Sequence, residues 1–158
     1  MSETLETVVG QLLTDQQLTL ALAESCTGGL IGHRLTDVPG SSGYFLGGVV
    51  AYSYNAKETF LNVRHATLDD FGAVSPETAI ELARGARHAF GADIGLSVTG
   101  IAGPGGGLPG KPVGLVYISL STRTFERTEK FVWQKDRVGN KWASSEAALQ
   151  MLKDYLDG

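Results

Sequence analysis

The chain has 158 residues, a formal net charge of −4 and a hydrophobic fraction of 42%. This length suits one domain with a substantial buried core, so residues 1–158 are predicted to form a single domain. The acidic balance and the absence of a basic run argue against a nucleic-acid-binding protein.

Cellular location is predicted from the cysteine count and the N-terminus. Cys26 is the one cysteine, which excludes a disulfide within the chain and favours a reducing compartment. Residues 1–17 are acidic and amphipathic, unlike a signal peptide. No apolar run reaches the roughly 18 residues of a membrane helix. The sequence therefore predicts a cytoplasmic protein that does not enter a membrane.

The first half of the chain alternates between strand and helix patterns. Apolar residues at spacings of three and four predict a helix over residues 3–16. An apolar run at 18–23 predicts a buried strand, and a short helix is expected over 27–36. Residues 38–43 have turn chemistry. A strand over 44–52 and a helix over 54–62 follow.

The second half begins with a well-marked helix over residues 76–90, with Ser75 as its N-cap, Pro76 in its first turn and Gly91 at its end. A strand is predicted over 94–99 and a glycine-rich loop over 100–110. Strands over 113–121 and 124–133 form a hairpin, and the last helix covers 137–156. This order predicts an α/β fold with a mixed sheet between helices.

Residues 24–29, Glu-Ser-Cys-Thr-Gly-Gly, join the first strand to the next helix. Hydroxyl groups and free backbone N–H groups at a helix start suit an anion such as phosphate. Ser25 is equally well placed as a simple helix cap. The pattern alone leaves both interpretations open.

The third strand is followed by a glycine-rich segment, residues 99–107. It is neither a Walker A motif nor a dinucleotide fingerprint, because Lys111 lies well past the glycines and no helix starts there. Its backbone amides suit a phosphate or sugar, and a plain surface connection fits the composition as well. Because ligands bind at the carboxyl ends of parallel strands, this segment is expected to converge with residues 24–29 and 53–57.

A serine and a lysine suggest nucleophilic catalysis. Ser42 lies in a Gly-Ser-Ser-Gly turn, and Lys57 falls in the first turn of the predicted helix 54–62. The helix dipole and partial burial both lower a lysine pKa there, and a neutral lysine can deprotonate a serine hydroxyl. The two residues meet only if the second strand runs antiparallel or the turn folds over. An ordinary surface lysine is the alternative.

Other chemistries have less support. The histidines lack metal-ligand spacing and one cysteine cannot complete a zinc cluster, so no metal site is predicted. No Gly-x-Ser-x-Gly elbow is present. Cys26 is interpreted as a small buried residue. Tyr52, close to Lys57 in sequence, can stack on a flat ring.

Seven motifs in order resemble those of a known family. They are Ala23–Gly29, Gly40–Ser42, Tyr52–Lys57, Gly72–Ser75, Thr99–Pro104, Lys111–Gly114 and Asp136–Arg137. From about residue 5 to 156 the chain resembles the CinA C-terminal domain family, which includes PncC-type nicotinamide mononucleotide deamidases. That family often carries Gly before the Asp-Arg pair and a second Arg four residues on, where this chain has Lys135 and Lys141.

The resemblance implies a three-layer α/β/α sandwich with a mixed, mostly parallel sheet. It also implies a hydrolase that converts nicotinamide mononucleotide to nicotinate mononucleotide and ammonia, in NAD recycling, without a metal or cofactor. By the family pattern Ser42 is the nucleophile, Lys57 the general base, and Thr99 assists at the reacting centre. Substrate binding falls to Ser25, Thr27, Gly28, Tyr52, Gly100, Gly103 and Arg137.

Two other functions stay open, a catalytically silent nucleotide-binding or regulatory module and a purely structural partner. The expected partner is a small-molecule mononucleotide, not nucleic acid. A homodimer or higher homo-oligomer is expected, because the hairpin near the C-terminus leaves a sheet edge that needs cover. Glu24 is expected to lie near Lys57 and to orient it.

Overall fold

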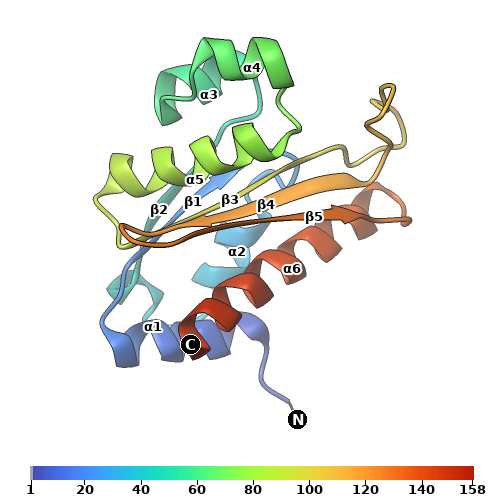
Figure 1. The fold of residues 1–158 in the computed structure, drawn as a ribbon. Helices are drawn as coiled ribbons and strands as arrows, with labels where there is room; N and C mark the ends of the chain where they lie inside the picture. Colours follow the sequence, from blue (N-terminus) through green and yellow to red (C-terminus); the bar gives the residue numbers. More distant parts are fainter. Residues whose placement is uncertain (1) are drawn as a thin grey trace.

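A five-stranded sheet organises the computed structural model, which describes residues 2–158 (Figure 1). The strand order is β2-β1-β3-β4-β5, in which β1 pairs in parallel with β2 and β3, and β4 and β5 pair antiparallel to their neighbours. The predicted mixed sheet is thereby confirmed. The strands are β1 (Leu20–Glu24), β2 (Phe45–Val50), β3 (Ile94–Gly100), β4 (Leu115–Ser121) and β5 (Glu126–Val132).

Helices cover both faces of this sheet, which confirms the three-layer α/β/α sandwich (Figure 1). One face carries α1 (Leu5–Gln16), α2 (Leu30–Thr36) and α6 (Arg137–Asp157). The other carries α3 (Tyr54–Leu61), α4 (His65–Phe71) and α5 (Pro76–Phe90). A short 3-10 helix, η1 (Ser41–Gly43), precedes β2.

The helix with the clearest end signals was predicted at its observed bounds. The Ser75 hydroxyl accepts a hydrogen bond from the backbone N–H of Thr78, and Gly91 adopts the left-handed conformation that ends α5. Helix α4 was missed, because seven residues without a side-chain cap carry little periodicity. Long helices with clear end signals could therefore be predicted from the sequence, whereas a short helix such as α4 could not.

Helix α5 lies unusually close to its neighbours. A Cβ atom on Gly95 of β3 would lie 2.0 Å from the carbonyl oxygen of Ala83, and one on Gly85 would lie 2.0 Å from that of Leu61. Glycine at these two positions lets α5 touch the sheet on one side and α3 on the other. The layer that carries Lys57 is thus held tightly against β1 and β3.

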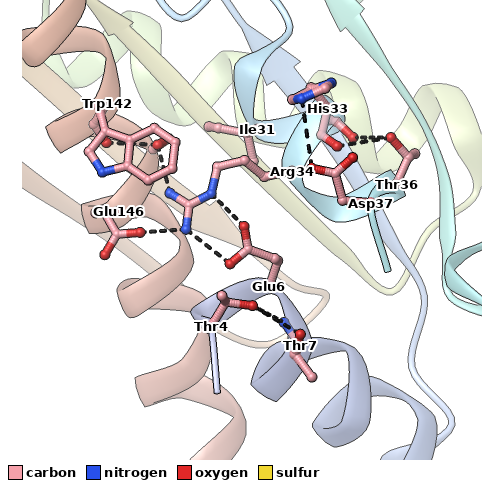
Figure 2. Close-up of polar contacts among 12 residues, drawn as sticks. Thr4, Glu6, Thr7, Ile31, His33, Arg34, Thr36, Asp37, Trp142 and Glu146 are labelled. Atoms are coloured by element: carbon pink, nitrogen blue, oxygen red, sulfur yellow. Dashed lines mark hydrogen bonds and ion pairs between the residues drawn. The ribbon is translucent and has the colours of Figure 1, made fainter. Parts of the chain in front are cut away.

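A buried cation joins the three helices of the opposite layer (Figure 2). Arg34 of α2 is 4% exposed and donates to both carboxylate oxygens of Glu6 in α1, at 2.7 and 3.1 Å. It also pairs with Glu146 and donates to Ser145 at 2.8 Å, while its guanidinium carbon lies 4.3 Å from the Trp142 ring centroid. The Arg34 cluster therefore fixes α6 relative to α1 and α2.

No helix within residues 2–158 is both long enough and apolar enough to cross a membrane. Within the same residues, no three His, Cys, Asp or Glu side chains are grouped as a metal site would require.

Candidate functional site

The centre of the candidate site is a contact between Lys57 and Ser25. Lys57 Nζ lies 3.1 Å from Ser25 Oγ, and both residues are buried. Ser25 directly follows β1, while Lys57 lies in α3, which follows β2. Because β1 and β2 are parallel neighbours, the segments at their carboxyl ends meet, as expected for an open α/β sheet.

Burial has a direct electrostatic effect on this lysine. Lys57 is 1% exposed, and burial lowers its pKa to about 8, because the charged form loses its hydration. The ammonium group is held by the backbone oxygens of Ala51 at 2.8 Å and Tyr52 at 3.3 Å. The expected lowering of the pKa is thus found, and the surface-lysine alternative is wrong. At neutral to mildly basic pH this amine can act as a base.

A small pocket opens onto the Ser25–Lys57 pair. Its volume is about 180 Å³, less than the roughly 300–1,000 Å³ of sites that enclose drug-sized ligands. It can therefore hold one ring, with any further part of a ligand outside. Among the predicted site residues, it is lined by Ser25, Tyr52, Lys57, Thr99, Gly100 and Arg137.

Thr99 and Arg137 are each fixed by hydrogen bonds at this pocket. The Thr99 hydroxyl donates to the backbone oxygen of Ala73 at 2.8 Å, so its oxygen is left to accept. Arg137 donates to the backbone oxygen of Gly103 at 2.7 Å and to the Tyr52 hydroxyl at 3.1 Å. A guanidinium has five N–H donors, so Arg137 retains others for an anion.

Ser42 is not brought to this site within the chain. It lies exposed in η1, before the first residue of β2, whereas Ser25 and Lys57 lie beyond the carboxyl ends of β1 and β2. The parallel pairing of these strands puts Ser42 at the opposite edge of the sheet, and the turn does not fold over. The expected Ser42–Lys57 contact is therefore corrected to a Ser25–Lys57 contact.

Glu24 also differs from expectation. Its carboxylate accepts hydrogen bonds from the Thr27 hydroxyl at 2.6 Å and from the backbone N–H groups of Ile31 and Gly32, each at 3.0 Å. The start of α2, where the sequence allows a phosphate, is thus occupied by the protein's own anion. Glu24 orients the loop after β1 and makes no hydrogen bond to Lys57 in the described structure.

The remaining predicted residues lie around the pocket without all entering it. Thr27 is committed to Glu24, and Gly28 lies exposed, where an added Cβ would be 3.7 Å from Lys141 Nζ. The glycine-rich loop is held by Asn140, which donates to the backbone oxygen of Ala102 at 2.9 Å. Sequence reasoning missed Asn140, and its position one turn after Asp136 was the available signal.

Cys26 lies beside the Ser25–Lys57 pair but is chemically unsuited to compete with it. Burial raises the pKa of its thiol to about 12, so the thiolate is scarce at neutral pH. Its interpretation as a small buried residue is confirmed.

Curated relatives match nearly all of this chain. It is 54% identical over 154 residues to a CinA-like protein of Chlorobaculum tepidum, covering 94% of this chain and 36% of that protein. A CinA-like protein of Desulfotalea psychrophila is 49% identical over 154 residues, covering 98% and 37%. The chain thus spans little more than a third of the length of the curated relatives it matches.

Solved structures of similar length share the fold. The competence/damage inducible protein CihA of Agrobacterium tumefaciens has a TM-score of 0.91 and 38% identity, with 100% of both chains covered. A CinA superfamily protein of Klebsiella pneumoniae has a TM-score of 0.94 and 32% identity, with 97% of this chain and 96% of that chain covered. The model of the CinA C-terminal domain matches residues 2–156, and the chain belongs to that family.

Proposed function

We propose that residues 1–158 act as one catalytic domain that hydrolyses the carboxamide of nicotinamide mononucleotide, with Ser25 as nucleophile and Lys57 as general base. The observation that carries this proposal is the buried Lys57 Nζ, 3.1 Å from Ser25 Oγ, where both residues line a pocket. Ser25 thereby takes the role expected of Ser42. The reaction belongs to NAD recycling in the cytoplasm.

In the first half of the proposed reaction, neutral Lys57 accepts the Ser25 hydroxyl proton as Oγ attacks the carboxamide carbon. The carbonyl electrons move to oxygen, and the backbone N–H of Cys26, the residue after the nucleophile, is the expected donor to that oxyanion. As the C–N bond breaks, Lys57 gives the proton to the leaving nitrogen. Ammonia departs, and an ester remains on Ser25.

Water completes the cycle. Lys57 takes a proton from water as the water oxygen adds to the ester carbon. The bond from that carbon to Ser25 Oγ then breaks, and Oγ regains the proton from Lys57. The products are the free enzyme and a carboxylic acid, which ionises to the carboxylate by giving its proton to the released ammonia or to solvent, so protons and bonds balance without a further reactant.

The pocket supports a pyridine nucleotide as the substrate. Its volume of about 180 Å³ suits the nicotinamide ring, and Tyr52 at its mouth can stack on that ring. Thr99 Oγ1 can accept a hydrogen bond from the carboxamide NH₂, because its own hydrogen is given to Ala73. The ribose and phosphate then lie outside, where Arg137 carries free donors.

Ammonia release from nicotinamide mononucleotide by the purified protein tests this function. Ser25→Ala and Lys57→Met should each reduce release at least about a thousandfold, as expected for residues that act as one unit. Lys153→Met, on the far part of α6, is the matched control and should retain activity. Ser42→Ala decides between the two serines, because a loss as large as that of Ser25→Ala would contradict the assigned nucleophile.

If the folded wild-type protein binds the nucleotide but releases no ammonia, the hydrolase proposal is wrong and the chain is a catalytically silent binding module. Circular dichroism of each variant separates lost chemistry from lost folding. Both the hydrolase and the silent binding module would bind a small-molecule mononucleotide.

A further inference from the structure

Asn140 is a buried amide near the start of α6, and its side chain is held at both ends. Its Nδ2 donates to the backbone oxygen of Ala102 at 2.9 Å, and its Oδ1 accepts from the backbone N–H of Lys135 at 3.0 Å. A backbone oxygen only accepts and a backbone N–H only donates, so one orientation of the amide serves both contacts. Asn140 is 1% exposed. It therefore has a single defined position between α6 and the loop that follows β3 (Figure 1).

Three successive carbonyl oxygens fix the first part of that loop. The oxygen of Ile101 accepts from the chain that enters β4, at 2.8 Å. The oxygen of Ala102 accepts from Asn140. The oxygen of Gly103 accepts from Arg137 at 2.7 Å. The residues that follow Gly103 in the loop are exposed. The hydrogen bond from Asn140 is thus the last one before the residue that Arg137 contacts.

Ala102 belongs to the wall of the candidate pocket. It is 8% exposed and lines the pocket together with Thr99 and Gly100. Its hydrogen bond with Asn140 is buried, so removal of the amide would leave a buried carbonyl group without a partner. The loop would then have to shift to bring that oxygen to water, and the adjoining Gly103 would shift with it.

Arg137 depends on the same loop for its direction. The side chain is exposed and donates to the oxygen of Gly103 at 2.7 Å and to the Tyr52 hydroxyl at 3.1 Å. A free arginine side chain has many rotamers, so an anion binds more tightly when the guanidinium is already held in place. Arg137 and Asn140 are three positions apart on α6 and lie on the same side of the helix. One helix face thus holds two adjacent carbonyl groups of the loop.

We propose that Asn140 is a positioning residue, which fixes residues 102–103 and thereby holds the Arg137 guanidinium at the pocket mouth for the phosphate of the substrate. Asn140 acts through Arg137, because both ends of its own amide are bonded to the protein. This role rests on the proposed function, which supplies the ligand, whereas its test measures binding and does not require turnover.

Calorimetric dissociation constants of nicotinamide mononucleotide and nicotinamide riboside test this role. The measurements use Ser25→Ala protein, so that neither ligand is hydrolysed. Asn140→Leu keeps the approximate size of the side chain and removes both of its hydrogen bonds. It should weaken binding of the mononucleotide at least about fivefold, and binding of the riboside, which lacks the phosphate, less than about twofold.

Combination with Arg137→Ala separates positioning from a general disturbance of the pocket. If Asn140 acts through Arg137, Asn140→Leu should weaken mononucleotide binding by less than about twofold once Arg137 is replaced. Independent effects would multiply instead. Gln150→Leu is the matched control, because it removes an exposed amide of the same helix, which donates to Asp154 at 2.8 Å. It should leave the affinity for both ligands unchanged.

Circular dichroism and urea denaturation show whether each variant folds. Asn140→Ala is the second variant, because alanine favours a helix and introduces no larger group. It should discriminate between the two ligands as Asn140→Leu does.

Three outcomes would overturn the role of Asn140. Equal weakening of both ligands would show that the amide supports the whole pocket. An unchanged affinity for the mononucleotide would show that the loop keeps its position without the amide. Multiplied losses in the double variant would show that Asn140 does not act through Arg137. Absence of ammonia release by wild-type protein contradicts the proposed hydrolysis alone, because the dissociation constants still decide the role of Asn140.

Discussion

Lys57 Nζ contacts Ser25 Oγ across 32 positions of sequence, at 3.1 Å. A neutral lysine amine has two hydrogens and one lone pair, and two backbone oxygens, of Ala51 and Tyr52, already face that amine. If those oxygens take the two hydrogens, the lone pair is left for the Ser25 hydroxyl. The arrangement of a general base is therefore built by backbone groups before any substrate arrives.

The pH dependence of kcat/KM should report this lysine. Only the neutral amine can accept the Ser25 proton, and burial lowers the Lys57 pKa to about 8. We expect kcat/KM to rise about tenfold per pH unit below pH 8 and to level off above it. Initial rates of ammonia release between about pH 5.5 and 10 measure this profile. A rise centred near the ordinary lysine value of about 10.4 would contradict the assigned base.

We expect Arg137 to bind the phosphate group of the substrate. The guanidinium is held by Gly103 and Tyr52 and retains free donors at the pocket mouth. Arg137→Ala should raise KM for nicotinamide mononucleotide about tenfold or more, while its kcat changes much less. For nicotinamide riboside, which lacks the phosphate, the same substitution should change kcat/KM by less than about threefold. If kcat/KM falls equally for both substrates, Arg137 contacts the nicotinamide ring or the ribose and not the phosphate.

Conversion of Arg137 to lysine gives a finer comparison. A lysine carries one point charge and cannot hold the Gly103 oxygen and the Tyr52 hydroxyl as a planar fork does. Arg137→Lys should therefore recover only part of the affinity lost in Arg137→Ala.

The sequence predicted the elements better than the contacts between them. Helix α5 and the hairpin of β4 and β5 followed from local signals, namely Ser75, Gly91 and the turn at residues 122–123. The candidate pocket was also placed at the correct sheet edge. Which serine enters it depends on the direction of β2 relative to β1, a long-range property that no local pattern contains.

Glu24 illustrates the same limit. A carboxylate next to a candidate serine was expected to orient the lysine, but its three hydrogen bonds run to Thr27 and the start of α2. The free N–H groups of a helix start attract the nearest anion, and here the chain supplies that anion itself. The sequence left open whether this helix start binds a phosphate, and only the three-dimensional structure shows that Glu24 occupies its N–H groups.

Gly95 should be intolerant of a single added methyl group. Its Cβ would lie 2.0 Å from the Ala83 carbonyl oxygen, so α5 would have to move away from β3. Gly95→Ala should lower the free energy of unfolding by about 1–3 kcal/mol, the range for overpacked cores. Urea denaturation measures the change, with Gly43→Ala as the control, because beyond its own chain neighbours nothing lies within 4 Å of a Cβ added there. Equal stability of the two variants would show that α5 shifts freely.

The Arg34 cluster should make the free energy of unfolding depend on pH in the acidic range. Hydrogen bonding to Arg34 lowers the pKa of Glu6 from 4.5 to about 2 (Figure 2). The folded state therefore favours ionised Glu6, so this stabilisation is complete above about pH 4.5 and is lost as the pH falls toward 2. Glu6→Gln should cost about 1–3 kcal/mol at neutral pH, the range for hydrogen bonds to charged groups. The difference from wild type should shrink toward zero near pH 2, by urea denaturation at several pH values. Glu3→Gln, outside the cluster, should match wild type throughout, and a Glu6→Gln cost that does not change with pH would contradict the assigned ion pair.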